Sequence, residues 1–234
     1  MTFRTPEGSR VPALTADQMR EVDRVMTKEL RIELTQMMEN AGRGLAELAI
    51  RRFAPGIVTV LAGPGGNGGG GLAAARHLAN RGVDVTATLS RDPPPGTVTA
   101  HQLEIVTRMG ITVSPEPRPA DLIIDAIIGY GLRGDPRERS ASLITWASGQ
   151  DQPVLALDLP SGLDATTGRP GRPCARAAAT ITLALPKTGL ASPLAGELFL
   201  ADISVPQAVY RRFGLRVPDL FRHDTIVGLR ASPS

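Results

Sequence analysis

The sequence predicts an α/β domain whose mainly parallel sheet is covered by helices on both faces. Two segments with helical periodicity come before the first strand-like run, and apolar runs then alternate with helical segments along the chain. The runs at 57–62 and 121–128 are apolar on both faces, which is typical of strands buried in a parallel sheet. A hydrophobic fraction of 42% over 234 residues suits one large domain with a full core.

The first two helices precede the sheet. Thr15 followed by Gln18 forms a capping-box pattern, with apolar residues at helical spacing after it, and a second helix is expected from about Thr35. Residues 1–13 are rich in Pro, Gly and charge and are expected to be a flexible lead-in. The predicted domain therefore spans 14–215, and 216–234 is expected to be a C-terminal tail.

From residue 57 onward, strands and helices are expected to alternate. Strands are expected at 57–62, 83–90, 111–113, 121–128, 153–160, 179–185 and 197–203. Helices are expected from about Leu72 to 80, and over 98–109, 140–148 and 207–213.

Composition excludes several classes of function. The excess of 26 Lys and Arg over 23 Asp and Glu is small and the basic residues are scattered, which argues against a dedicated nucleic-acid face. A single cysteine, Cys174, excludes an internal disulfide, and the three histidines are not at ligand spacing. Because no stretch has the length and apolarity of a membrane span and no leader is recognisable, we expect no membrane partner and a cytoplasmic location.

The segment GPGGNGGGG, residues 63–71, follows the first expected strand. Glycine is unfavourable inside regular structure, so such a dense run indicates a backbone that bends sharply or closely approaches another group. Gly63, Gly65 and Gly68 satisfy the GxGxxG spacing, but this match alone is weak evidence of nucleotide binding. No Gly-Lys-Ser/Thr ends the run, which excludes a Walker loop.

Two further polar segments follow expected strands. Asp125 and a glycine-rich turn lie in IIDAIIGYGLRGD, and Asp158 and Ser161 lie in LALDLPSGLD. Ligands of parallel sheets bind beyond the carboxyl ends of the strands, so these segments and the glycine run are expected to converge. Structural roles remain open for each alone, since Asp125 could cap a helix and Asp158 could form a turn.

These residue types suit a phosphate-bearing ligand and a hard cation. Backbone N–H groups of the glycine run and the start of the following helix can hold a pyrophosphate, which Arg133 could also approach. Asn67, Asp125 and Ser161 are all oxygen donors, a set that suits a hard cation. Asp158 is then the ionisable group best placed for proton transfer.

Six blocks carry a resemblance to a known family: TADQMREVD, MMENAG, GPGGNGGGGLAAARHL, DLIIDAIIGYGLRG, LDLPSGLDATTG and TITLALPKTGL, in this order between about residues 15 and 205. Together they resemble the YjeF N-terminal domain family, whose enzymes are NAD(P)H-hydrate epimerases. The resemblance implies a three-layer α/β/α Rossmann-like sandwich, commonly a homodimer, that interconverts the R and S forms of NADH or NADPH hydrated at C6 of the nicotinamide ring. It also implies a functional partner, an NAD(P)H-hydrate dehydratase that accepts only the S form.

The resemblance assigns site residues by position. A potassium ion would be held by Asn67, Asp125 and Ser161, and Asp158 would contact substrate. We expect Asp158 to be the catalytic acid and base, with Lys187 either orienting it or lying on the surface. The remaining implied substrate contacts are Gly66, Asn67, Gly68, Gly69 and Gly70, together with Gly129, Tyr130, Gly131, Leu132, Arg133, Gly134 and Asp135.

The glycine run departs from the family pattern at two positions. Gly66 and Gly70 stand where the pattern has Asn and Asp, so the backbone N–H donors remain but the Asp carboxylate does not. This leaves two alternatives to an epimerase. One is a nucleotide-binding or dimerisation module without catalysis. The other is an NADP-dependent dehydrogenase in which Ser90 and Arg91, after the second strand of the glycine-run unit, bind a 2′-phosphate.

Overall fold

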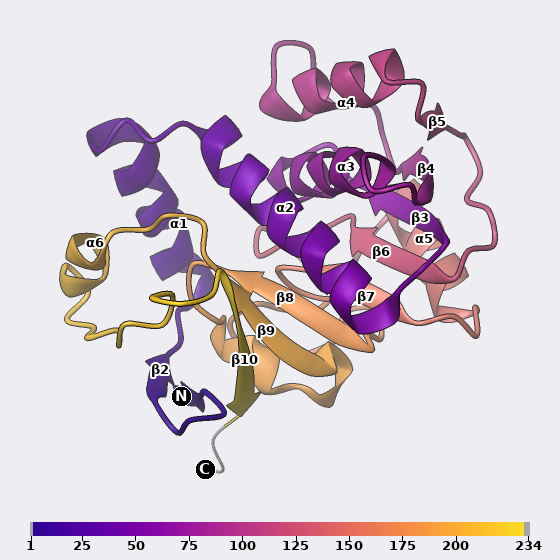
Figure 1. Ribbon diagram of the computed structural model, residues 1–234. Coiled ribbons are helices and arrows are strands. Elements are labelled where there is room, and N and C mark those ends of the chain that lie inside the picture. The colour runs from indigo at the N-terminus through magenta and orange to yellow at the C-terminus, as the bar shows by residue number, and fades with distance from the viewer. Residues whose placement is uncertain (1, 232–234) are drawn as a thin grey trace.

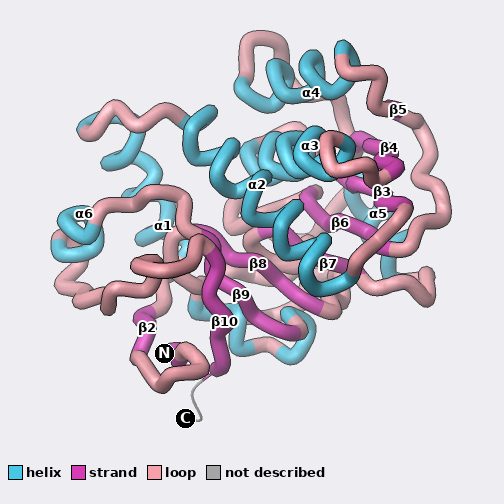
Figure 2. The backbone as a smooth tube through the Cα atoms, in the orientation of Figure 1, coloured by secondary structure: helices cyan, strands magenta, loops and turns pink. Residues whose placement is uncertain are grey.

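The computed structural model describes residues 2–231, which form a ten-stranded sheet with helices on both faces (Figures 1 and 2). Along the sheet the strand order is β2-β1-β10-β9-β8-β7-β6-β3-β4-β5. The strands are β1 (Thr2–Arg4), β2 (Arg10–Pro12), β3 (Ile57–Ala62), β4 (Asp84–Leu89), β5 (Thr112–Val113), β6 (Leu122–Ala126), β7 (Val154–Leu157), β8 (Ala179–Leu183), β9 (Glu197–Ala201) and β10 (Ile226–Ala231).

The central part of the sheet is parallel, as predicted. Each neighbouring pair from β5 through β9 runs parallel, whereas β10 pairs antiparallel with β9 and with β1, and β1 pairs antiparallel with β2. Within the parallel part of the sheet, the chain enters at β3, moves outward through β4 to β5, and returns to the other side of β3 at β6. The strand order thus reverses between β3 and β6, which is where parallel sheets bind ligands.

The helices occupy the positions that periodicity predicts. The Thr15 and Gln18 capping box is present at the start of α1, and Glu33 and Gln36 form a second one at the start of α2. The helices are α1 (Ala16–Arg24), which continues into a π-helical turn η1 (Val25–Glu29), then α2 (Leu34–Phe53), α3 (Gly66–Ala79), α4 (Val98–Arg108), α5 (Glu138–Ser148) and α6 (Gln207–Arg211), with short 3-10 turns η2 (Thr188–Ala191) and η3 (Pro193–Ala195).

Alternation along the strands divides the core into two layers. In β3, Val58 and Val60 pack in the cluster formed with α2, α3 and α4, whereas Leu61 packs with α5 on the opposite face. Figure 1 shows α2 and α3 crossing the same face of the sheet. A third apolar cluster joins α1 and α6 to the end of the sheet that contains β8 and β9. The architecture is therefore the predicted α/β/α sandwich.

The two chain ends differ from the prediction. Residues 1–13 were expected to be a flexible lead-in, but they contribute β1 and β2, and Phe3 and Val11 are fully buried. The expected tail, 216–234, contributes β10, which pairs Phe3 of β1 with Ala231. Prediction failed here because β1 pairs with β10 at the far end of the chain and β2 joins the sheet only through β1, and local composition carries no signal of the pairing between the chain ends.

The glycine run is helical rather than a loop. Helix α3 begins at Gly66, not near Leu72 as expected, because these glycines permit close packing. A Cβ at Gly68 would lie 1.8 Å from the Gly63 carbonyl oxygen, and one at Gly71 would lie 2.5 Å from the Cβ of Ala126 in β6. The run therefore brings the first turns of α3 down onto the strand ends. Among residues 2–231, no helix is both long and apolar enough to cross a membrane.

Candidate active site

A large cavity lies at the carboxyl ends of β3, β6 and β7, beside the point where strand order reverses. It has a volume of about 650 Å³, which is within the usual range for small-molecule sites. Its walls come from α1, α2, the start of α3 and the segments that follow β6 and β7. They include Met19, Asp23, Met37, Met38, Gly65, Gly66, Asn67, Gly70, Gly129, Tyr130, Gly131, Asp158 and Lys187.

Asp158 and Lys187 form an ion pair in this cavity. The Lys187 ammonium group donates to Asp158 Oδ1, and the two side chains are 0% and 5% exposed for Lys187 and Asp158 respectively. The ammonium group also donates to the Leu183 carbonyl oxygen at 2.9 Å and to Thr182 Oγ1 at 3.5 Å. Lys187 thus directs all three of its N–H donors to the protein and orients the carboxylate, which resolves the open question of its role.

The hydrogen bonds to Asp158 leave one of its oxygens for a ligand. Thr182 Oγ1 and Leu183 N both approach Oδ1, each at 3.3 Å, and among the described residues no hydrogen bond reaches Oδ2. The backbone of Asp158 has φ +68°, a conformation that costs free energy for a non-glycine residue. The strand end therefore presents this carboxylate to the cavity in a fixed orientation.

A second carboxylate, Asp23, also lines the cavity, and the sequence analysis did not single it out. The Tyr130 hydroxyl donates to Asp23 Oδ2, and the Lys187 ammonium lies 6.0 Å from the centre of the Tyr130 ring. Burial raises the pKa of Asp23, and the hydrogen bond from Tyr130 opposes that shift. Burial and the charge of Asp23 raise the pKa of Tyr130. Asp23 lies four residues after the buried Met19 in α1, so an acidic residue on a buried helical face was the available signal.

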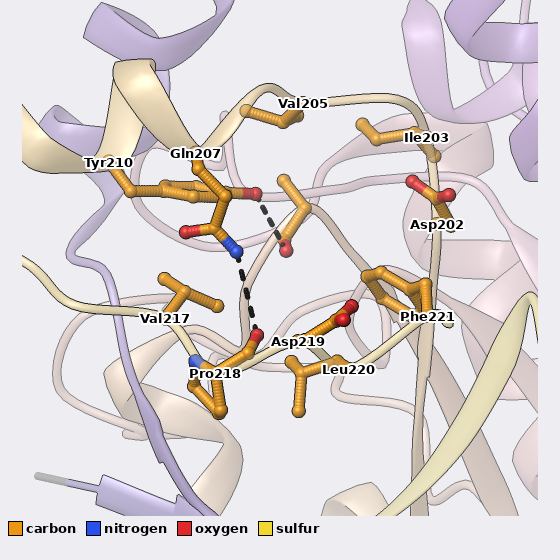
Figure 3. Close-up of a pocket in the computed structure, with 11 residues that line it drawn as sticks. Asp202, Ile203, Val205, Gln207, Tyr210, Val217, Pro218, Asp219, Leu220 and Phe221 are labelled. Carbon is orange, nitrogen blue, oxygen red and sulfur yellow. Dashed lines mark hydrogen bonds between the residues drawn. The ribbon is translucent and has the colours of Figure 1, made fainter. Parts of the chain in front are cut away.

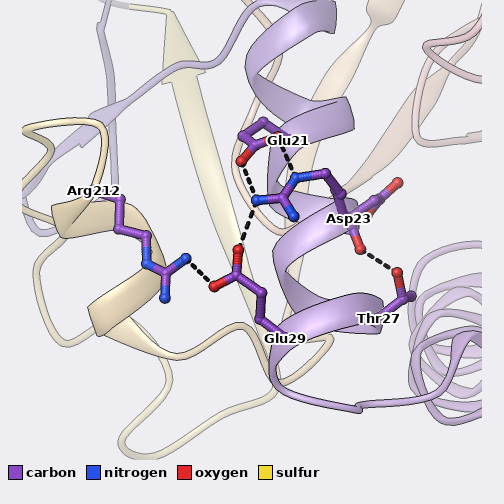
Figure 4. A network of polar contacts seen from close by, with 6 residues as sticks. Glu21, Asp23, Thr27, Glu29 and Arg212 are labelled. Carbon is purple, nitrogen blue, oxygen red and sulfur yellow. Dashed lines mark hydrogen bonds and ion pairs between the residues drawn. The ribbon is translucent and has the colours of Figure 1, made fainter.

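Polar contacts around Asp23 fix the end of α1 (Figure 4). Thr27 Oγ1 donates to the Asp23 carbonyl oxygen at 2.8 Å. Arg24 donates to Glu21 and Glu29, and Arg212 donates to Glu29 from the C-terminal side of α6. Helix α1, the π-helical turn and the segment after α6 are therefore tied together behind the cavity wall.

Asp125 and Ser161 are brought together beside Ile127 and Ile128, which line the cavity and from whose backbone N–H groups they accept hydrogen bonds. Ser161 N donates to Asp125 Oδ2 at 2.7 Å, Ser161 Oγ donates to Oδ1, and Ile127 N approaches Oδ1 at 3.3 Å. Burial raises the pKa of Asp125, and the hydrogen bonds from Ser161 and Ile127 oppose that shift. Among residues 2–231, no cationic side chain pairs with this buried carboxylate. Buried charges in proteins are commonly paired or bound to a cation.

Asn67 lies in the first turn of α3, against the segment that Ser161 anchors. A Cβ at Gly129 would lie 3.3 Å from Asn67 Oδ1, so the two residues pack closely. Ser161 Oγ accepts from Ile128 N at 2.8 Å, one residue before Gly129. The amide Nδ2 of Asn67 is buried without a hydrogen-bond partner among the described residues, which leaves it available to a ligand.

The remaining expected contact residues separate into four groups. Gly66, Asn67, Gly70, Gly129, Tyr130 and Gly131 line the large cavity with Asp158, whereas Gly68 and Gly69 are buried inside α3. Leu132, Arg133 and Asp135 line a neighbouring cavity, and Gly134 lines neither. The structure thus brings Asn67 and Asp158 to one cavity and places Asp125 and Ser161 beside the segment that lines it. The turn that contains Arg133 lines the neighbouring cavity.

A further, small cavity lies away from these strand ends, at the C-terminal side of the molecule (Figure 3). Its volume is about 60 Å³, which is room for only a few atoms. Tyr210 closes it by donating to the Ala184 carbonyl oxygen at 2.9 Å, and Gln207 Nε2 approaches the Pro218 carbonyl oxygen at 3.5 Å. These contacts hold the segment after α6 against the core, and the cavity is too small for a nucleotide.

Several proteins of similar sequence are named as enzymes of NAD(P)H-hydrate repair. A protein of Dehalogenimonas lykanthroporepellens named NAD(P)H-hydrate epimerase is 46% identical over 224 residues, covering 92% of this chain and 91% of that protein. A protein of the same name from Rhodopirellula baltica is 34% identical, covering 88% and 90%. The bifunctional NAD(P)H-hydrate repair enzyme Nnr of Moorella thermoacetica is 38% identical over 83% of this chain, which spans only 41% of that longer protein.

Comparison of structures supports the fold. The crystal structure of the yeast protein ynu0 superposes with a TM-score of 0.82, covering 93% of this chain and 100% of the yeast chain. The sequence identity is 22%, so this likeness bears on the fold alone. The family model for the YjeF-related protein N-terminus matches residues 34–189, the range that contains the glycine run and both buried aspartates of the site. The chain therefore belongs to the YjeF-related protein N-terminus family.

Proposed function

We propose that this protein is an NAD(P)H-hydrate epimerase, which interconverts the R and S forms of NADH or NADPH hydrated at C6. The names of its full-length relatives support this activity. The structural observation that carries the proposal is the buried pair of Asp158 and Lys187, whose Asp158 Oδ2 remains available in a cavity of about 650 Å³. Such a cavity can hold the hydrated nicotinamide ring next to a proton donor and acceptor.

The chemistry requires one proton to move in each direction. The ring nitrogen next to C6 donates its electron pair as the C6–O bond breaks, giving an iminium-like ring. When the hydrate is bound, Asp158 carries a proton on Oδ2 and gives it to the departing hydroxyl, which leaves as water. The resulting carboxylate, still held by Lys187 at Oδ1, then takes a proton from the water that adds to the opposite face and returns to its starting form. Atoms and protons balance, and such acid and base assistance is typically worth about 10²- to 10⁴-fold in rate.

Lys187 and Asp23 support this step without entering it. Lys187 holds Asp158 Oδ1, so that proton transfer takes place at Oδ2. Asp23 accepts a hydrogen bond from the Tyr130 hydroxyl, and the Lys187 ammonium group lies over the ring of the same tyrosine. We expect this wall to position the ring and to exclude bulk water, assisted by the apolar side chains of Met19, Met37 and Met38.

The dinucleotide phosphates fit the start of α3. This helix has 14 residues, and the N–H groups of its first turn have no partner within the helix. They lie where the cavity is lined by Gly65, Gly66 and Asn67. Backbone donors and the positive end of the helix dipole together favour a pyrophosphate there.

We propose that Asn67, Asp125 and Ser161 hold a potassium ion. The set supplies only oxygen ligands and includes a buried carboxylate with neutral hydrogen-bond donors, so a monovalent cation would offset the cost of burying its charge. A bound potassium ion would supply positive charge that fixes the 127–129 segment beside the substrate. The residues themselves set this geometry, because Ser161 bonds Ile128 and Asn67 contacts Gly129.

The two departures from the family glycine pattern are compatible with this proposal. A Cβ at Gly70 would lie 2.8 Å from Cδ2 of Leu157, so Leu157 occupies space that an Asp at this position would need. At Gly66 a Cβ would meet only the end of Met38, at 3.7 Å. Both positions keep their backbone N–H groups, and the acid and base of the proposed mechanism is Asp158, not the carboxylate that the glycine run lacks.

We propose a homodimer that acts in the cytoplasm beside an NAD(P)H-hydrate dehydratase. The family resemblance supports the dimer and the dehydratase partner. The longer bifunctional relatives, of which this chain spans 41% and 45%, support a close link between the epimerase and a second repair activity. Light scattering of the purified protein tests the dimer directly.

Conversion of R-form hydrate in the presence of an S-specific dehydratase tests the proposed activity. The wild-type protein should accelerate consumption of the R form, and Asp158→Asn should abolish the acceleration while the circular dichroism spectrum is unchanged. Asp84→Asn is the matched control, because Asp84 is exposed and pairs with Arg118 at the start of β4, away from the cavity. No acceleration by wild-type protein, or full activity of Asp158→Asn, would refute the proposal.

A further inference from the structure

A second cavity of about 330 Å³ adjoins the proposed active site and has a different chemical character. The two cavities share Pro64, Ile128 and Ser140 in their walls. Whereas the first is mainly apolar around a buried ion pair, the second is lined by four arginines, Arg91, Arg133, Arg137 and Arg139, and by Ser90 as well as the shared Ser140. A ligand that leaves the first cavity past Pro64 enters this one.

The charge balance of the second cavity favours an anion. Asp135 and Glu138 also line it, and Glu116 pairs with Arg139 at 3.4 Å, so four arginines and three carboxylates leave a formal charge of +1. Asp135 already accepts a hydrogen bond from Arg172 N at 3.0 Å. Within residues 2–231, Arg91, Arg133 and Arg137 form no ion pair with an acidic side chain. Guanidinium groups in such a cluster match the geometry of a phosphate.

Two buried polar groups in the same wall have no partner. Ser90 is 7% exposed, and its hydroxyl oxygen makes no hydrogen bond to the described residues. Arg139 Nε donates to the Leu89 carbonyl oxygen at 3.0 Å, which fixes the guanidinium group, yet its Nη2 is buried without a partner. Buried polar groups are nearly always satisfied in native proteins, so these two point to a ligand that accepts hydrogen bonds.

The position of Ser90 and Arg91 identifies which end of the ligand reaches them. They follow β4, the second strand of the β3, α3, β4 unit whose first turn holds the glycine run. In dinucleotide-binding βαβ units, the residue at the end of the second strand faces the 2′ position of the adenosine ribose. An acidic residue there suits a 2′-hydroxyl, whereas arginine accommodates a 2′-phosphate. Here the strand is followed by serine and arginine.

We propose that this arginine cavity binds the 2′-phosphate of the adenosine ribose, so that the protein prefers the hydrate of NADPH to that of NADH. The inference rests on the proposed function only in taking a dinucleotide as the ligand. Ser90 Oγ and Arg139 Nη2 are the preplaced donors at the wall. The exposed Arg91, Arg133 and Arg137 close around the phosphate from the rim.

Titration calorimetry with adenosine 2′,5′-bisphosphate and with adenosine 5′-diphosphate tests this assignment. Neither probe contains nicotinamide, so the result does not depend on epimerase activity. We expect the 2′,5′-bisphosphate to bind about tenfold or more tightly than the diphosphate, because it alone places a phosphate in the arginine cavity. Inorganic phosphate, as a third probe, reports binding that requires no nucleoside.

Variants make the test specific. Arg91→Ala should weaken the 2′,5′-bisphosphate about tenfold and leave the affinity for the 5′-diphosphate unchanged. Arg91 is exposed and its side chain makes no hydrogen bond or ion pair among residues 2–231, and Arg137→Ala provides a second exposed change in the same cavity. Arg108→Ala is the control, since Arg108 is exposed on α4 and pairs only with Glu104.

Three outcomes would overturn the inference. These are equal affinity for the two nucleotides, an unchanged affinity of both arginine variants, or inorganic phosphate binding as tightly as the 2′,5′-bisphosphate. The last would indicate a site for a free anion. If the protein shows no epimerase activity but still binds the 2′,5′-bisphosphate selectively, this inference stands. Epimerase activity and phosphate selectivity are measured with different ligands.

Discussion

The Lys187 ammonium group and the Asp158 carboxylate form an ion pair in which the side chains are 0% and 5% exposed respectively. Such a pair stabilises its members only as a unit, because either charge alone would be buried without compensation. Lys187 reaches Asp158 from the segment that follows β8, whereas Asp158 follows β7, so the pair also joins two strand ends. Under the proposed mechanism, catalysis and local stability therefore depend on the same contact.

Replacing Lys187 by Met should destabilise the protein more than replacing both partners. Lys187→Met leaves the Asp158 carboxylate unpaired and should cost about 3–5 kcal/mol in the free energy of unfolding. The double variant Lys187→Met, Asp158→Asn removes both charges and should recover part of that loss. Urea unfolding of the wild type, both single variants and the double variant measures the coupling, and additive effects would show that the pair is not a unit.

Asp23 should make stability fall as pH rises. Burial raises its folded pKa above the unfolded value, so the protonated form is favoured in the fold. Its stabilising contribution is present below the unfolded pKa, about 3.9, and is lost as pH rises through the folded pKa. Asp23→Asn removes this titration, so the variant should gain stability relative to wild type as pH rises above about 4. Lys187, Asp158, Arg20 and Tyr130 line the same cavity and are retained in both proteins.

Chemical denaturation at a series of pH values measures that difference. Asp17→Asn is the control, since Asp17 is 91% exposed on the same helix. If the difference between Asp23→Asn and wild type is constant over this range, burial does not shift the titration of Asp23.

Potassium should stabilise the protein through Asp125. A ligand that binds only the folded state raises the apparent stability by mass action, by about 2.7 kcal/mol at a concentration one hundred times its dissociation constant. Thermal unfolding in potassium chloride should therefore give a higher Tm than in choline chloride at equal ionic strength. Asp125→Asn keeps the size of the side chain, removes its charge and should abolish the difference.

Ser161→Ala tests the same proposed site by a second route. It removes the hydroxyl that bonds both Asp125 and Ile128, so it should weaken the potassium response and not abolish it. Equal Tm values in the two salts for the wild-type protein would contradict the proposed cation site.

Patterns within one element made most of the sheet and its helices predictable. The capping box at Thr15 and the doubly apolar strands are local signals, and the structure places the corresponding elements where those signals indicate. Strands β1 and β10 were missed because their pairing joins the two chain ends, and β2 was missed because it enters the sheet only through β1. The start of α3 was missed because glycine has low helix propensity, and only contact with β6 and α2 reveals why the helix begins there.

The site was predictable to the same extent. Residues at strand ends, such as Asp125 and Asp158, follow from topology, since parallel strands end at one edge of the sheet. Asp23 and the burial of Lys187 could not be derived in this way, because a helix from the start of the chain and a segment beyond β8 deliver them to the cavity. The local sequence does not indicate that α1 and α2 form the wall opposite the strand ends. It also does not indicate that two separate cavities form there.

Two glycines in α2 should respond in opposite directions to replacement by alanine. Gly42 faces α3, and a Cβ there would lie 2.5 Å from the Cβ of Ala73 and 2.8 Å from Ala74 N. Gly42→Ala must push α2 and α3 apart and should cost about 1–3 kcal/mol in the free energy of unfolding. A Cβ at Gly44 would lie 3.4 Å from the Cβ of Ala201, a normal contact. Gly44→Ala should stabilise by up to about 1 kcal/mol through helix propensity.

Urea unfolding of the two variants measures this contrast within one helix. Since α3 begins at the cavity, Gly42→Ala should also reduce substrate affinity by shifting its first turn, whereas Gly44→Ala should leave affinity unchanged. If the two variants changed stability equally, α2 and α3 would be free to separate. The glycine run would then not fix the position of the first turn of α3.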